Sequence, residues 1–109
     1  MNTIQLKKGE QKTLKITVTN KNTKKIISLT GCSLTLVMKL MSKNRESNII
    51  TKNDSDFDKS NVSEGIIRVL ISSNDINTIG KYNCQLKIEF PNNDIDLSDI
   101  FEMNITDPL

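Results

Sequence analysis

Residues 80–90, with the sequence Gly-Lys-Tyr-Asn-Cys-Gln-Leu-Lys-Ile-Glu-Phe, decide the fold class of this chain. Apolar side chains occupy every second position from Tyr82 to Phe90, and the positions between them are polar. Successive side chains of a β-strand point to opposite faces of the sheet, so this period of two predicts a strand with one buried face. Gly80 opens the segment, and the turn signal of residues 91–94, Pro-Asn-Asn-Asp, closes it.

The same alternation recurs on both sides of this segment. The other alternating stretches are residues 4–6, 14–18, 32–40, 67–71 and 101–105, and a short edge strand is expected at 49–51. Polar stretches and turn signals separate them, and no window of useful length has the 3.6-residue period of a helix. Two half-buried sheets must pack face to face. The pattern therefore predicts an all-β sandwich of about seven to eight antiparallel strands.

Length and composition limit what this sandwich can do. The chain has 109 residues, which corresponds to one domain over residues 1–109, and its 36% hydrophobic and 26% charged residues are typical of a soluble protein. The net charge of +2 gives no basic excess for nucleic acid. The chain has no histidine for proton transfer, no tryptophan and one tyrosine. We therefore expect no enzyme, no catalytic residue and no cofactor.

The amino terminus has no apolar segment of the length that a secretory signal needs. The longest apolar-rich run, Leu34 to Met41, is too short to cross a bilayer. We therefore expect synthesis in the cytoplasm and no association with a membrane.

Two cysteines, Cys32 and Cys84, have the parity of inward-facing residues. Tyr82-x-Cys84 resembles the surroundings of the second cysteine in a true immunoglobulin disulfide, but Cys32 falls on the third strong strand, where the partner should be on the second. A reducing compartment also disfavours a bridge. Buried free thiols are the favoured interpretation, and a disulfide is the alternative.

Four acidic residues fall in the polar stretch 53–64, namely Asp54, Asp56, Asp58 and Glu64. Carboxylates at alternate positions can converge on Ca²⁺, but the EF-hand template fails because Lys59 replaces its essential glycine and Gly65 replaces its last acidic ligand. A solvated acidic loop without metal is the favoured interpretation.

Four apolar residues have the parity of the outer faces, namely Val37, Met41, Ile66 and Leu70. The exterior of a sandwich should be mostly polar, and exposed apolar area indicates a partner. These residues are therefore a candidate protein–protein interface. The alternative is that they pack under the loop of residues 42–53.

The order of several short motifs carries a resemblance to a known family. Leu29-Thr30-Gly31 precedes the third strong strand, and Gly80-Lys81-Tyr82 opens the penultimate one. With the strand pattern from Ile4 to Ile105, they resemble the immunoglobulin-like domain at the amino terminus of phage baseplate upper proteins, also found in other phage tail and virion proteins. Ser28 and Cys32 depart from that pattern, where an acidic residue and alanine are common. The resemblance implies an immunoglobulin-like sandwich with a structural role and no catalytic residues.

Tyr82 has a structural interpretation of its own. In immunoglobulin-like sandwiches, a tyrosine near the start of this strand can bond back to the main chain of the preceding corner. Gly80-Lys81-Tyr82 follows the crossing segment 72–79, which fits this tyrosine corner. The alternative is an ordinary core tyrosine.

The resemblance implies a non-enzymatic virion structural protein of the tail, baseplate, collar or head surface. Its expected partners are other virion proteins and further copies of itself, in a virion assembled after synthesis in a bacterial cytoplasm. The alternative function is an adhesin-like module that binds host cell-surface carbohydrate. It ranks lower because the few aromatic side chains, Phe57, Tyr82, Phe90 and Phe101, are mostly assigned to the core.

Overall fold

The computed structural model of the chain describes residues 3–20, 22–41, 49–75 and 78–107. These residues form nine strands and two short 3₁₀ turns. The strands are β1 (Thr3–Lys7), β2 (Lys12–Thr17), β3 (Ser33–Leu40), β4 (Ile49–Lys52), β5 (Phe57–Asp58), β6 (Ile66–Ile71), β7 (Gly80–Glu89), β8 (Ile95–Leu97) and β9 (Phe101–Thr106). The turns are η1 (Asp54–Asp56) and η2 (Val62–Glu64).

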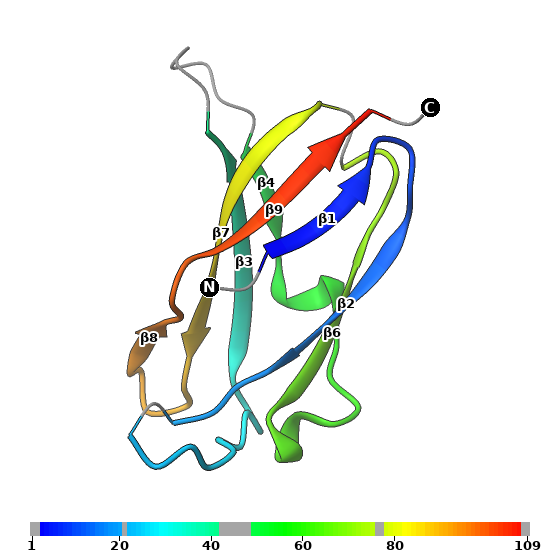
Figure 1. Cartoon of the computed structure of the whole chain (residues 1–109). Helices are drawn as coiled ribbons and strands as arrows, with labels where there is room; N and C mark the ends of the chain where they lie inside the picture. Colours follow the sequence, from blue (N-terminus) through cyan, green and yellow to red (C-terminus); the bar gives the residue numbers. More distant parts are fainter. Residues whose placement is uncertain (1–2, 21, 42–48, 76–77, 108–109) are drawn as a thin grey trace.

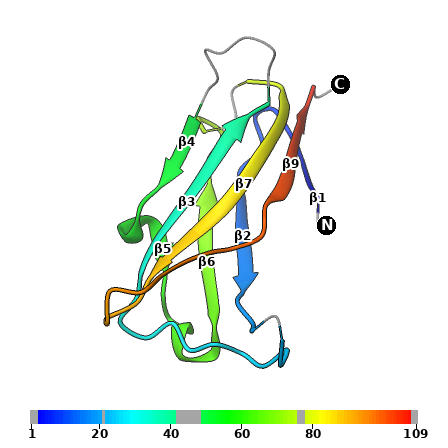
Figure 2. The same cartoon turned by 90° about the vertical axis from the view of Figure 1, so that its left-hand side faces the viewer.

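The strands form two sheets that pack as a sandwich (Figure 1). The large sheet has the order β1-β9-β7-β3-β4, and β8 pairs with the remaining part of β7. The small sheet has the order β2-β6-β5. Turned by 90°, the molecule shows β3 and β7 of the large sheet in front of β2 and β6 of the small one (Figure 2). The expected all-β, immunoglobulin-like sandwich is confirmed.

Two details differ from the expected seven to eight antiparallel strands. The additional strands β5 and β8 have two and three residues, too few to display a period in the sequence. In addition, β1 pairs with β9 in parallel, from Thr3 opposite Glu102 to Lys7 opposite Thr106. After β1 the chain turns at Gly9 and crosses to the small sheet, so no hairpin forces β1 to run antiparallel to its neighbour.

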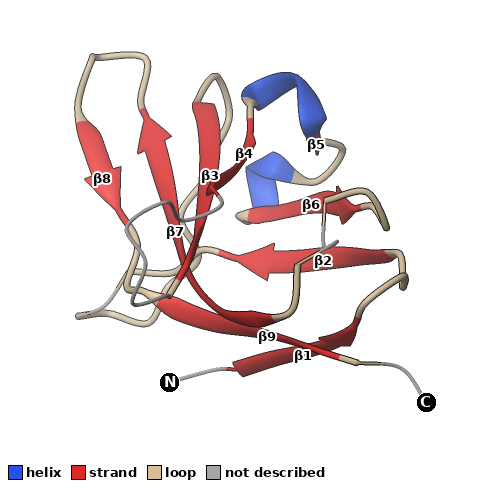
Figure 3. Cartoon of the chain, turned by 90° about the horizontal axis from the view of Figure 1, so that it is seen from above, coloured by secondary structure: helices blue, strands red, loops and turns tan. Residues whose placement is uncertain are grey.

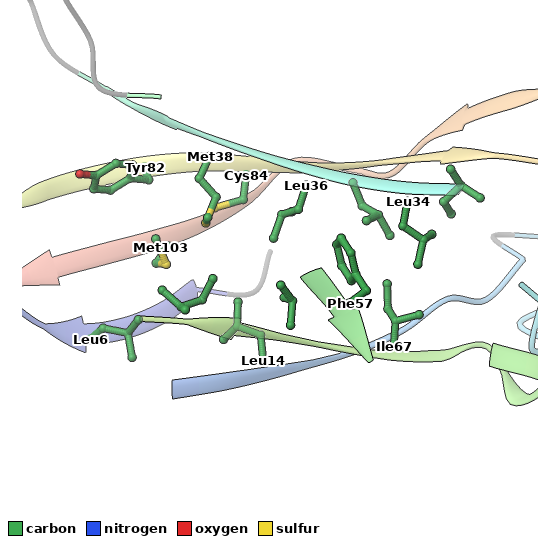
Figure 4. Close-up of a cluster of buried hydrophobic side chains, with 14 of the residues drawn as sticks. Leu6, Leu14, Leu34, Leu36, Met38, Phe57, Ile67, Tyr82, Cys84 and Met103 are labelled. Atoms are coloured by element: carbon green, nitrogen blue, oxygen red, sulfur yellow. The ribbon is translucent and has the colours of Figure 1, made fainter. Parts of the chain in front are cut away.

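The alternating segments become strands because each buries one row of side chains between the sheets. In β3, Leu34, Leu36 and Met38 are buried, and in β7 the buried row runs from Tyr82 to Ile88. Figure 4 shows Leu36 and Met38 facing Leu14 of the small sheet. The complete buried core is Leu6, Leu14, Leu29, Cys32, Leu34, Leu36, Met38, Phe57, Ile67, Val69, Ile71, Tyr82, Cys84, Leu86, Ile88, Met103 and Ile105.

A tight turn joins β7 to β8 and fixes their register. The main-chain N–H of Asn93 donates to the carbonyl of Phe90 at 2.9 Å, and that of Phe90 donates to the carbonyl of Asp94 at 2.8 Å. Asn93 has a φ of 74°, a left-handed conformation that asparagine tolerates better than most residues. The turn therefore places Ile95 opposite Glu89 and Leu97 opposite Lys87. The twist of the large sheet carries β8 and β1 apart when the molecule is viewed from above (Figure 3).

An ion pair links β4 to the segment that follows β6. The ammonium of Lys52 lies 2.6 Å from Asp75 Oδ2, and both side chains are largely shielded from solvent. The same carboxylate oxygen accepts hydrogen bonds from the main-chain N–H and the hydroxyl of Ser72, at 2.8 and 3.0 Å. Because Ser72 directly follows Ile71, the last residue of β6, this contact joins the large sheet to the small one at their margin.

Candidate functional site

The carboxylates in the acidic stretch after β4 bind to neighbouring groups of the protein. Asp54 pairs with Lys59, and its Oδ1 accepts the main-chain N–H of Leu34 at 2.8 Å. The hydrogen bond from Lys59 holds the pKa of Asp54 below its usual value. Asp56 Oδ2 accepts the main-chain N–H of Asn53 at 2.8 Å. These carboxylates therefore stabilise η1 and its attachment to β3.

Asp58 and Glu64, the other two acidic residues of the stretch, each have hydrogen-bond partners of their own. Asp58 Oδ1 accepts both the main-chain N–H and the hydroxyl of Ser60, and these bonds hold its pKa below the usual value. Glu64 accepts a hydrogen bond from Asn61 at 3.4 Å. In the part of the chain that the structure describes, no three His, Cys, Asp or Glu side chains gather as a metal site would require.

The two cysteines are buried free thiols. Cys84 lies opposite Met38 in the ladder between β3 and β7, whereas Cys32 precedes β3 and is six residues before Met38. At about 3.3 Å per residue, the two thiols are separated by roughly 20 Å along the sheet, far beyond the span of a disulfide. Burial raises the pKa of Cys84 to about 12, and burial also raises the pKa of Cys32. Both thiols therefore stay protonated and have low reactivity, because the thiolate is the reactive form.

Tyr82 is completely buried at the start of β7. Its hydroxyl donates a hydrogen bond to the main-chain carbonyl of Thr78 at 2.9 Å. A bond from this position to the main chain a few residues upstream has the geometry of a tyrosine corner. It anchors the segment that crosses between the sheets.

The four candidate interface residues do not form one surface. Val37 and Met41 lie on the outer face of the large sheet, where they are 37% and 56% exposed. Ile66 and Leu70 lie on β6, on the outer face of the small sheet. Leu70 is 44% exposed and Ile66 is half-buried. The alternative, that they pack under the loop after β3, concerns residues 42–48, which lie outside the described part of the chain.

The outer face of the large sheet carries further apolar side chains beside Val37 and Met41. Across the sheet, Val37 lies opposite Gln85 and Lys39 lies opposite Ile49. The face continues over β8, where the outward residues pair with Lys87 and Glu89. We call the exposed apolar members of this face the outer patch, and they are Val37, Met41, Ile49, Ile95, Leu97 and Ile100.

Polar and charged residues lie between the apolar members of the outer patch. A shallow pocket of about 340 Å³ is lined by Val37, Met41 and Ile100, together with their polar neighbours. The side-chain amide of Gln85 donates to the carbonyl of Ser98 at 2.9 Å, and this bond holds the segment before β9 against β7. The face also carries the exposed charged residues Lys39, Lys81, Lys87 and Glu89. The outer patch is therefore an apolar surface interrupted by charges.

The outer face of the small sheet is different. Its outward positions on β2 are Thr13, Lys15 and Thr17, and Lys15 lies opposite Arg68. Arg68 in turn lies opposite Asp58 and donates a hydrogen bond to Asn61 at 2.9 Å. Leu70 stands among these polar groups as a single exposed apolar side chain, which needs no partner to explain it.

Reasoning from the sequence missed four members of the outer patch, Ile49, Ile95, Leu97 and Ile100. The alternation of Ile95, Asp96 and Leu97 was available as a signal, but three residues are too few to identify a strand. Ile100 reaches this face because of the bond between Gln85 and Ser98, which no sequence pattern records.

Three comparisons with known proteins show what this chain is similar to. A family model described as the BppU N-terminal domain matches residues 1–109. A solved structure of murine CRIg is similar over 94% of this chain and 91% of its own, with 10% sequence identity and a TM-score of 0.46. A search of the curated proteins finds no match. Among the described residues, no helix is long and apolar enough to cross a membrane.

Proposed function

The chain belongs to the family of BppU N-terminal domains, the amino-terminal domains of phage baseplate upper proteins, and from this premise we propose that it is a non-enzymatic structural component of a phage virion that assembles through its outer patch. The family supports a role in the baseplate or another part of the virion. The tail, the collar and the head surface are the other positions that fit such a role.

One observation carries the proposal: six of the exposed large apolar side chains lie on one face of one sheet, the outer patch. Exposed apolar area gathered on one face of a domain indicates a site of contact with a partner. Lys39, Lys87 and Glu89 lie among the members of the patch, so charged contacts can select the orientation of that partner. The partner that fits is another virion protein or a second copy of this chain.

The strength of such a contact favours assembly in many copies. Burial of a large aliphatic side chain contributes about 1.5–3 kcal/mol when it starts fully exposed, and the members of the outer patch are about half exposed. Their combined contribution is of the same order as the association cost of about 4–15 kcal/mol. One domain alone binds weakly, and repeated copies linked in a particle bind firmly. A contact of this strength favours a homo-oligomer or a repeated assembly component.

The alternative function, recognition of host carbohydrate, has less support. Phe57 and Tyr82 are buried in the core, and Phe90 and Phe101 are half-buried. These four side chains are all the aromatic residues of the chain. None of them offers a freely exposed ring face of the kind on which a sugar stacks.

The test is incorporation into particles. A phage that lacks this chain is complemented with the wild type, with the double variant Val37→Ser/Ile100→Ser, or with Leu70→Ser on the opposite face. Mass spectrometry of purified particles then measures how much of the chain is bound. We expect at least a tenfold loss for the double variant, because two central patch contacts worth about 0.7 kcal/mol or more each are removed. Leu70→Ser should be incorporated normally.

Thermal denaturation checks that both variants remain folded. Equal incorporation of all three proteins would show that the outer patch is not the assembly contact. A selective loss for Leu70→Ser would show that the contact lies on the small sheet instead.

A further inference from the structure

A second surface lies at the margin between the two sheets, away from the outer patch. It is a groove of about 1460 Å³, lined by β2 and the following loop on one side and by β8 and the start of β9 on the other. Its apolar lining residues, which we call the floor, include Ile16, Val18, Ile27, Leu86, Ile88 and Phe90. The volume exceeds the range of about 300–1,000 Å³ that is usual for small-molecule sites. A groove of this size suits a polymer.

One wall of the groove is a strand edge. β2 pairs with β6 on one side, and the described residues provide no strand on its other side. The main-chain N–H of Val18 donates to the carbonyl of Gly65 at 2.8 Å. Because main-chain groups alternate in direction along a strand, those of Ile16 also face β6, and those of Lys15 and Thr17 face away from it. This edge offers hydrogen bonds with the spacing of an extended polypeptide.

The opposite wall is acidic. Asp96 lies opposite Ile88 in the ladder between β7 and β8, and Ile88 belongs to the buried row, so the side chain of Asp96 is on the inner side of the sheet. Asp96 and Asp99 both line the groove. Asp96 is exposed and forms no ion pair with a described residue. This charge complements a Lys or Arg side chain of an occupant.

The same charge argues against β8 of a second copy as the occupant. An inward-facing charge on an edge strand is one of the devices that prevents like edges from pairing with each other. If β8 of another copy lay along β2, its Asp96 would be placed against the apolar floor formed by Ile16 and Ile88. Burial of a carboxylate without a cationic partner is costly.

We propose that this groove receives an extended segment of a different polypeptide, which adds as a strand to the free edge of β2. Alternate side chains of the segment are apolar and rest on Ile16, Ile88 and their neighbours, and one inward side chain is a Lys or Arg that pairs with Asp96. The main chain of the segment bonds to Lys15 and Thr17. This site is separate from the outer patch, so either of the two contacts can fail without the other.

The test uses the full chain and two end-blocked synthetic peptides of eight residues. Both alternate threonine with valine, and one valine is replaced by lysine in the first peptide and by glutamate in the second. Amide hydrogen exchange is followed by NMR at each residue. With the lysine peptide at ten times its dissociation constant, exchange at the amides of Lys15 and Thr17 should slow about tenfold. The amides of Leu14 and Ile16, which already face β6, should be unchanged.

Two variants distinguish strand addition from loose association. Asp96→Lys should lower the affinity for the lysine peptide by up to about fivefold, because an exposed ion pair contributes up to about 1 kcal/mol. The same substitution should raise the affinity for the glutamate peptide. Lys15→Pro removes a donor that β6 does not use and should abolish the protection, whereas Lys15→Thr keeps the donor and should preserve it. Circular dichroism confirms that both variants at position 15 remain folded.

Three results would overturn the proposal. The first is no protection of the β2 edge by either peptide at 10 mM, a concentration of about ten times a weak millimolar dissociation constant. The second is equal binding of both peptides by the wild type and by Asp96→Lys. The third is a response of the groove residues to a chitin or glucan oligosaccharide but to neither peptide, which would assign the groove to carbohydrate.

Discussion

The hydroxyl of Tyr82 donates a hydrogen bond of 2.9 Å to the main-chain carbonyl of Thr78, four residues earlier in the chain. The ring is completely buried near the start of β7, and the bond ties the segment before β7 to that strand. This contact links Thr78, in the connection between the sheets, to β7 of the large sheet.

Tyr82→Phe tests the worth of this bond. The substitution keeps the ring in the core and removes only the donor. We expect a loss of about 1–2 kcal/mol in the free energy of unfolding, which corresponds to a fall of roughly 4–16 °C in Tm. Urea denaturation should show a lower midpoint with an unchanged slope. An unchanged midpoint would mean that the corner does not stabilise the fold.

The ion pair between Lys52 and Asp75 should make stability depend on pH. Burial acts to raise the pKa of Asp75, but the hydrogen bonds from Lys52 and Ser72 outweigh it and leave the pKa below its usual value. A carboxyl with a lowered folded pKa contributes its stability above the unfolded pKa of about 3.9 and loses it as the pH falls through the folded pKa. Stability of the wild type should therefore decline below about pH 4.

Asp75→Asn measures that contribution. At pH 7 the variant should be less stable by about 1–3 kcal/mol, because the shielded ammonium of Lys52 loses its charged partner. The difference between the two proteins should shrink as the pH falls from 5 to 2, followed by urea denaturation at each pH. Ser60→Ala, which removes a hydroxyl bonded to the exposed Asp58, serves as a surface control with a small effect. A difference that is constant with pH would contradict the assignment.

Gly65→Ala should be strongly destabilising. Gly65 follows η2 with a φ of 73°, and a Cβ placed there would lie 2.7 Å from the carbonyl oxygen of Ile27 and 2.9 Å from that of Val18. Main-chain atoms cannot move aside as a flexible side chain can, so we expect a loss of about 2–5 kcal/mol. Gly9→Ala is the matched control, because Gly9 has a φ of 97° but open space around its Cβ position. Equal losses in the two variants would show that backbone strain alone decides the cost.

The buried thiols should not react in the folded protein. Burial raises the pKa of both Cys32 and Cys84, so the thiolate needed for reaction is scarce at pH 8. Ellman's reagent should label neither cysteine within the lifetime of the native state and should label both in urea. Rapid labelling of one thiol in buffer would indicate local opening around it.

Much of the fold could be predicted from local patterns. The alternation in residues 32–40, 80–90 and 101–105 identified β3, β7 and β9, because the side-chain period of a strand is a property of the backbone alone. The parity of Val37 and Leu70 showed that both point away from the core, and both are exposed. The parity of Tyr82 likewise placed it in the core, where it is buried.

Only the tertiary structure decided which outward residues share a surface. Val37 and Met41 share the outer patch with Ile49 and Ile100, whereas Leu70 lies on the opposite sheet. Parity separates inside from outside, but it does not say to which sheet a strand belongs or which strand lies beside it. Those relations depend on hydrogen bonds between residues far apart in sequence, such as the parallel ladder that joins β1 to β9.

The groove beside β2 depends on the same long-range relations. Its floor combines Ile16 from one sheet with Ile88 from the other, and its acidic wall comes from β8, a strand of three residues that the sequence does not reveal. By itself the sequence determined a two-layered β-structure with a buried aliphatic core, because alternation and the burial of apolar area act locally. The pairing of the edges, which only the folded chain sets, decided which residues share the outer patch and which line the groove.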